Sequence, residues 1–142
     1  MPVIGYGTWD IRGKECIQCV KDAILNGYRL IDTARIYENE IEVGKGIESS
    51  GIAREELFLT TKLDSHCNSY ELAKNAIMDS LQRLHVDSID LVLIHEPYDH
   101  FLDMYKALEE AYDKGIVRAI GVSISIKEKW NSFLKNVEFF LP

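Results

Sequence analysis

The feature that most constrains this 142-residue sequence is a regular alternation of short apolar segments with amphipathic ones. The apolar spacing predicts helices over residues 14–26, 40–49, 69–84 and 102–114. Strands are predicted over residues 3–8, 28–32, 57–62, 89–95 and 117–122. Because strands that alternate with helices form right-handed βα units, the sequence predicts an α/β fold with a parallel sheet.

Four of the predicted strands end in, or are directly followed by, a polar residue, and these positions recur about every 30 residues, the length of one βα unit. They are Asp32, Lys62, His95 and Ser123. Ligands of parallel α/β sheets bind beyond the carboxyl ends of the strands, so we expect the four side chains to meet at one mouth. Taken singly, Asp32 could instead cap a turn, and Lys62 and His95 could be solvated strand ends.

The strongest helix pattern in the sequence lies in residues 69–84. Ser69 is a candidate N-cap, and the residues that follow it form one apolar stripe. The stripe consists of Leu72, Ala73, Ala76, Ile77, Ser80, Leu81 and Leu84. A last helix is expected over residues 126–134, and the apolar tail 137–141 could begin a further strand or cover a sheet edge.

Charge and composition exclude several classes of function. A net charge of −7 argues against a nucleic-acid partner. No apolar run approaches the ~18 residues of a membrane-spanning helix, so no membrane partner is expected. Three cysteines do not make a disulfide framework, which favours a reducing, cytoplasmic setting. Cys16 and Cys19 lie one helical turn apart without a second pair, and we expect helix-face or core thiols there rather than metal ligands.

Five segments carry a more specific pattern. The longest is G-Y-R-L-I-D-T-A-R-I-Y-E-N-E-I-E-V-G over residues 27–44. The others are G-Y-G-T-W at 5–9, L-F-L-T-T-K-L at 57–63, D-L-V-L-I-H-E-P at 90–97 and G-I-V-R-A-I-G-V-S at 115–123. In order and interval these segments resemble the aldo-keto reductase family, from the first residue to about Ser123.

The resemblance implies a TIM barrel, of which this chain would supply about five of the eight (β/α) units. A complete barrel of this kind takes about 250 residues. We therefore expect residues 1–142 to form a single partial (β/α)₈ domain, truncated relative to the family. An incomplete barrel leaves sheet edges unpaired, which predicts self-association through those edges.

The resemblance also implies NADPH-dependent reduction of small aldehydes and ketones by a tetrad that matches Asp32, Tyr37, Lys62 and His95. Negative charge develops on the carbonyl oxygen as hydride adds, and Tyr37 is the expected proton donor. We expect the Lys62 cation to lower the pKa of Tyr37 and Asp32 to balance that cation. A neutral His95 would orient the carbonyl by a hydrogen bond.

Further positions follow from the same resemblance. Gly7, Thr8, Asp32 and Ser123 are expected to contact the NADPH coenzyme, with no metal involved. Trp9, Tyr37 and His95 are expected to line the carbonyl substrate, although Trp9 could equally fill the core. Ile124 stands where the family usually has asparagine, whose amide isoleucine cannot replace. We expect the 142-residue chain alone to be weakly active or inactive, and the alternative is a catalytically dead homologue that serves as a binding or structural module.

Overall fold

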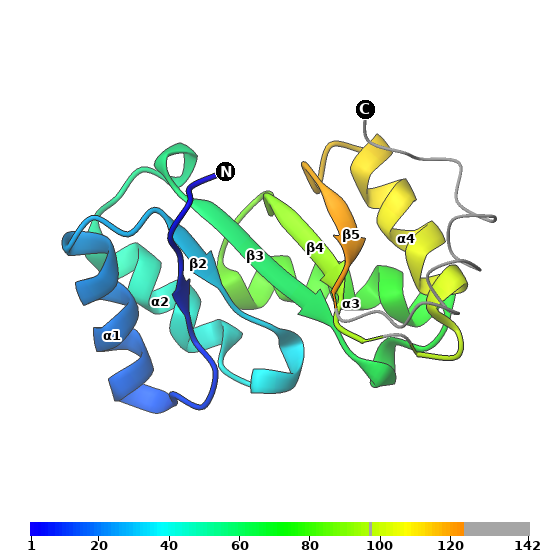
Figure 1. The fold of residues 1–142 in the computed structure, drawn as a ribbon, viewed down its shortest axis with the longest axis horizontal. Coiled ribbons are helices and arrows are strands. Elements are labelled where there is room, and N and C mark those ends of the chain that lie inside the picture. Colours follow the sequence, from blue (N-terminus) through cyan, green and yellow to red (C-terminus); the bar gives the residue numbers. More distant parts are fainter. Residues whose placement is uncertain (97, 124–142) are drawn as a thin grey trace.

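The structure is a computed structural model that describes residues 1–96 and 98–123. Its five strands form one sheet in chain order, and every neighbouring pair is parallel. The strands are β1 (Tyr6–Gly7), β2 (Leu30–Asp32), β3 (Phe58–Leu63), β4 (Leu91–Ile94) and β5 (Ile120–Val122). Figure 1 shows them side by side, and because β2 and β3 are parallel, their carboxyl ends lie at the same end of the sheet. The parallel α/β sheet predicted from the alternation is confirmed.

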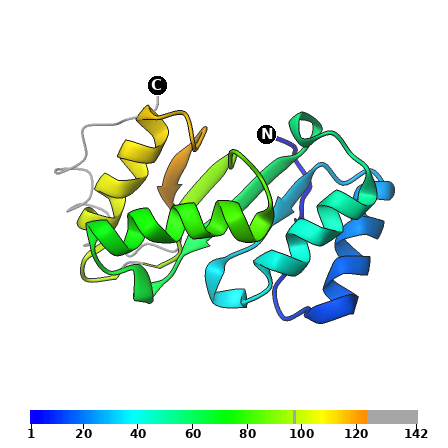
Figure 2. The same cartoon turned by 180° about the vertical axis from the view of Figure 1, so that it is seen from behind.

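Four helices connect the strands, each between two sequential strands of the sheet. They are α1 (Gly13–Leu25), α2 (Glu40–Ser50), α3 (Tyr70–Leu84) and α4 (Phe101–Asp113). Three short 3₁₀ turns add η1 (Arg35–Tyr37), η2 (Arg54–Glu56) and η3 (Ser65–Cys67). Seen from behind, α2 and α3 run across the sheet (Figure 2). In the described part of the chain, no helix is long and apolar enough to cross a membrane.

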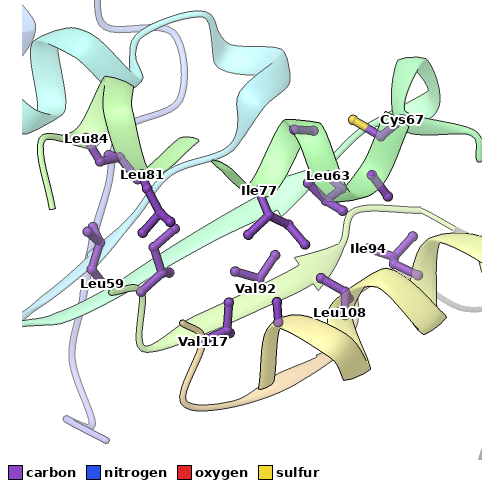
Figure 3. Packing of buried hydrophobic residues seen from close by; sticks show 14 of the residues in the cluster. Leu59, Leu63, Cys67, Ile77, Leu81, Leu84, Val92, Ile94, Leu108 and Val117 are labelled. Carbon is purple, nitrogen blue, oxygen red and sulfur yellow. The ribbon is translucent and has the colours of Figure 1, made fainter. Parts of the chain in front are cut away.

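The core lies between the helices and the facing side of the sheet. Leu59 and Leu63 on β3, with Val92 on β4, point toward the apolar stripe of α3 (Figure 3). Leu108 of α4 packs into the same layer beside Val92 and is fully buried (Figure 3). Burial of large aliphatic side chains stabilises such a layer by about 1.5–3 kcal/mol per residue. This packed layer fixes the positions of β3 and β4, and therefore of the residues at their carboxyl ends.

The opposite face of the sheet is not covered by any helix among the described residues (Figure 1). Side chains at paired positions of neighbouring strands share a face, so Leu93 lies on the same face as Lys62. Leu30, Phe58 and Leu91 lie on this face too, and all four apolar side chains are half-buried. We call these four residues the uncovered face.

The element boundaries differ from the predicted ones in instructive places. β1 covers two residues where residues 3–8 were predicted, because Val3 is fully exposed and Ile4 is 69% exposed. Ser69 caps α3 as predicted, its side chain accepting a hydrogen bond from the Leu72 N–H. Leu72 itself was wrongly placed in the buried stripe, since it is 49% exposed and burial begins at Ala73. The helix expected over 126–134 and the tail 137–141 lie outside the described residues.

Candidate active site

A partly buried ion pair forms the base of the mouth. Lys62, near the end of β3, donates from Nζ to Asp32 Oδ1 at 2.5 Å and to the Thr33 carbonyl oxygen at 3.0 Å. The Lys62 side chain is 8% exposed, and that of Asp32 is 37% exposed. A buried ammonium is costly unless it has a counter-charge and further hydrogen bonds, and here it has both. The pairing predicted from the sequence is thus present.

Tyr37 reaches the same place from outside the sheet. It ends η1, the turn that follows β2, and the Lys62 ammonium lies 5.5 Å from the centre of its ring. His95 follows β4, and its ring meets that of Tyr37 edge-on, with 5.8 Å between centroids. The structure therefore brings Asp32, Tyr37, Lys62 and His95 together, although three come from strand ends and one from a turn.

The electrostatics of Tyr37 differ from expectation. Burial, followed by the negative charge of Asp32, raises the pKa of Tyr37 above its ordinary value. The predicted lowering by Lys62 is wrong for this arrangement. The Lys62 charge is directed at Asp32 and the Thr33 carbonyl, not at the Tyr37 oxygen. At neutral pH the phenol therefore keeps its proton.

His95 is prepared to act as a neutral group. Burial, followed by the charge of Lys62, lowers the pKa of His95 below its ordinary value. Its Nδ1 is buried and has no hydrogen-bond partner among the described residues. The expectation of an uncharged His95 agrees with this environment.

The end of β1 forms another side of the mouth. Thr8 is buried, and its N–H donates to the Asp32 carbonyl oxygen at 3.0 Å. Gly7 is exposed, and a Cβ added there would meet nothing within 4 Å. Trp9 is 72% exposed, so the alternative in which it fills the core is wrong. An exposed indole provides a flat apolar surface for a ligand.

Ser123 follows β5 and extends the row of strand ends. Its N–H donates to the Ile94 carbonyl oxygen at 2.8 Å, as the His95 N–H does to Leu63 at 2.9 Å. These bonds continue the parallel ladder beyond the strands and place Ser123 beside the end of β4. The position of Ile124, which departs from the family pattern, lies outside the described residues.

Three polar residues behind the mouth, of which Asn39 and Glu40 are buried and Arg35 is partly buried, were not predicted from the sequence. Asn39 donates to the carbonyl oxygens of Thr8 and Ile11 and accepts from Thr33, which ties the β1 loop to the β2 loop. Glu40 is 1% exposed, and Arg35 reaches toward it from η1. All three follow Asp32 closely in the sequence. Arg35 and Asn39 lie in segments without strand or helix periodicity, and Glu40 is the first residue of the helix predicted over 40–49. Their burial depends on contacts with distant strands, which no local pattern reveals.

The cysteine thiols of the described residues belong to no metal-binding cluster. Cys16 is buried and Cys19 is partly buried on α1, and both are free thiols, as expected for helix-face or core residues. Across residues 1–96 and 98–123, no group of three or more histidine, cysteine or acidic side chains could hold a metal ion.

Comparison with known proteins places this geometry in a family. A model of the aldo/keto reductase family matches residues 3–133. The chain is 47% identical over 140 residues to the glyoxal reductase of Bacillus subtilis, covering 97% of this chain and 51% of that protein. It is 40% identical over 125 residues to the methylglyoxal reductase DkgA of Escherichia coli K12, covering 86% of this chain and 45% of that protein.

Solved structures agree. A deep-sea metagenome aldo-keto reductase superposes with a TM-score of 0.93 at 44% identity, covering 98% of this chain and 52% of that one. An aldo-keto reductase of Bombyx mori, solved in complex with NADP, gives 0.88 at 32% identity, with the same two coverages. The chain spans about half the length of these relatives, and its open five-stranded sheet corresponds to part of their TIM barrel. It belongs to the aldo/keto reductase family.

Proposed function

We propose that the mouth formed by Asp32, Tyr37, Lys62 and His95 reduces small aldehydes and ketones, with NADPH as coenzyme. The observation that carries this proposal is the Lys62–Asp32 ion pair lying beside the rings of Tyr37 and His95. Two relatives are named as reductases of glyoxal and methylglyoxal, which makes small dicarbonyl compounds the first substrates to try.

The chemistry follows from the protonation states. When bound, NADPH supplies the hydride that adds to the carbonyl carbon. Tyr37 gives its phenolic proton to the carbonyl oxygen as negative charge develops there, so that the product is an alcohol. His95 Nε2 holds the same oxygen in line by a hydrogen bond. Asp32 holds the Lys62 ammonium at the base of the mouth, 5.5 Å from the centre of the Tyr37 ring.

The coenzyme would lie along the strand ends. Gly7, Thr8, Asp32 and Ser123 are the residues proposed to contact it, and the exposed Trp9 would face the substrate. The exposed Gly7 leaves open space where a ring could approach the backbone closely. The 142 residues alone span about half of the relatives' length, and we expect them to show weak turnover or none.

A second candidate is a catalytically inactive family member that serves as a binding or structural module in the cytoplasm. The observation that favours it is the raised pKa of Tyr37, because a less acidic phenol transfers its proton less readily. The uncovered face of Leu30, Phe58, Leu91 and Leu93 would then be a surface for association, including with a second copy of the chain.

A chimaera separates the two candidates. This chain replaces the matching 140 residues of the Bacillus subtilis glyoxal reductase, which supplies the remainder of the protein. If the site reduces carbonyl compounds, the chimaera oxidises NADPH in the presence of glyoxal. The loss of NADPH absorbance measures this oxidation. A folded chimaera that binds NADPH but does not reduce glyoxal supports the inactive module instead.

A further inference from the structure

A buried carboxylate joins three elements behind the mouth. Glu40, the first residue of α2, accepts hydrogen bonds from Thr61 Oγ1 at 2.7 Å and from Ser80 Oγ at 3.3 Å. Thr61 belongs to β3 and Ser80 to α3, and both are fully buried. A buried carboxylate that keeps these partners is costly to assemble, which suggests a task beyond filling space.

Arg35 extends this arrangement to the turn that carries Tyr37. Its Nη1 donates to Ser80 Oγ and to the Ala76 carbonyl oxygen, each at 3.0 Å. Its Nη2 pairs with Asp79 at 2.9 Å, and Nη1 lies 3.8 Å from Glu40. The Arg35 side chain is only 15% exposed, and these bonds hold its guanidinium in one orientation against α3.

The hydrogen-bonded groups that run from Arg35 to Thr61 end beside two of the proposed catalytic residues. Arg35 begins η1, and Tyr37 ends it, so the guanidinium anchors the turn at its first residue. Thr61 directly precedes Lys62 on β3, and its side chain points to the helix side of the sheet while Lys62 points to the other. Arg35, Ser80, Glu40 and Thr61 therefore connect the Tyr37 turn to the Lys62 strand through buried groups.

We propose that Glu40 and Arg35 are positioning residues that set the placement of Tyr37 against Lys62 and His95. The importance of that placement rests on the proposed function, but the placement itself does not. Apolar contacts are not directional, so they constrain the orientation of a short turn less than hydrogen bonds do. Directed hydrogen bonds to a fixed carboxylate define both distance and orientation.

The chain offers a matched control. Arg54 also makes a partly buried network, donating to Asp90 at 2.6 Å and to the carbonyl oxygens of Leu57 and Ser88 at 2.9 Å. This network lies where β3 and β4 begin, at the end of the strands away from the mouth. Arg54→Leu removes a comparable set of bonds and should leave the Tyr37 turn undisturbed.

The test follows Tyr37 directly, without coenzyme or substrate. The 142-residue chain is labelled with ¹³C at the tyrosine ζ carbon, and Tyr37→Phe assigns the Tyr37 signal. Arg35→Leu and Thr61→Val should shift this signal and move its titration midpoint toward about 10, the value of a free tyrosine. Thr61→Ser, which restores a hydroxyl, should return both. The Tyr105 signal serves as an internal reference.

Two results would overturn the proposal. One is a Tyr37 signal and midpoint that stay unchanged in both Arg35→Leu and Thr61→Val. The other is an equal change in Arg54→Leu, which would make the effect a general loss of stability. If Arg35→Leu does not fold, the comparison of Thr61→Val with Thr61→Ser decides alone. Because no coenzyme is present, a failure of carbonyl reduction leaves this result unaffected.

Discussion

The ammonium of Lys62 lies 2.5 Å from Asp32 and almost entirely out of solvent. Asp32→Asn should therefore destabilise the chain by about 1.5–3 kcal/mol, the range for hydrogen bonds to charged groups, because it leaves a buried cation without its counter-charge. Urea unfolding measures the change. In the double variant Asp32→Asn/Lys62→Met much of the loss should be recovered. If the losses of the Asp32→Asn and Lys62→Met single variants add up to the loss of the double variant, the pair does not interact.

A glycine sets the distance between α2 and α3. A Cβ at Gly44 would come within 2.6 Å of the Leu84 carbonyl oxygen and 2.7 Å of its carbonyl carbon, both backbone atoms. Gly44→Ala should cost about 1–3 kcal/mol in the free energy of unfolding from overpacking, despite the better helix propensity of alanine. Lys45→Ala, at the exposed neighbouring position, is the control and should be near neutral. A Gly44→Ala chain as stable as the parent would contradict the close packing of these helices.

His95 predicts a dependence of stability on pH. Its pKa is lower in the folded chain than its ordinary value of 6.5, so the unfolded chain binds the proton at higher pH. The contribution of His95 to stability is therefore fully present above pH 6.5 and is lost as the pH drops below that value. Burial raises the pKa of Glu40 and acts in the opposite direction at acid pH, so the comparison must isolate the histidine.

The isolating variant is His95→Gln, which keeps Glu40 in both chains. The difference in unfolding free energy between parent and variant should become less favourable to the parent from pH 7 to pH 5.5. A difference that is constant over this range would show that the His95 ring is as easily protonated in the folded chain as in the unfolded one.

The uncovered face predicts self-association of the 142-residue chain. Leu93 and its three apolar neighbours are half-buried, and among the described residues β1 and β5 each pair on one side only. Sedimentation should show species larger than a monomer at micromolar concentration. Leu93→Glu should shift the distribution toward the monomer, whereas Leu25→Glu, at an exposed position of α1, should not. A compact monomer of the parent chain would count against this proposal.

The sequence was most informative where geometry repeats. Asp32, Lys62 and His95 could be placed at one mouth because parallel strands bring their carboxyl ends together, whatever the side chains between them. Tyr37 was found only through the resemblance, since it lies in a three-residue 3₁₀ turn with no periodic pattern.

Other features depend on tertiary contacts that no local pattern contains. Glu40 starts a helix, where an acidic residue usually faces solvent, yet β3 and α3 enclose it completely. The direction of the Tyr37 pKa was wrong because the sequence does not say where the Lys62 ammonium points. Leu72 fits the apolar spacing of α3 but lies beyond the edge of the surface that the helix covers.

The role of Tyr37 as proton donor is tested most directly by comparing Tyr37→Phe with its parent in the chimaera built on the glyoxal reductase. We measure NADPH affinity by fluorescence and the single-turnover rate of glyoxal reduction in both. We expect nearly equal NADPH affinity and a rate that falls by about 10²–10⁴-fold, the contribution of a positioned proton donor. A variant that reduces glyoxal at the parental rate would contradict the assignment of Tyr37 as proton donor.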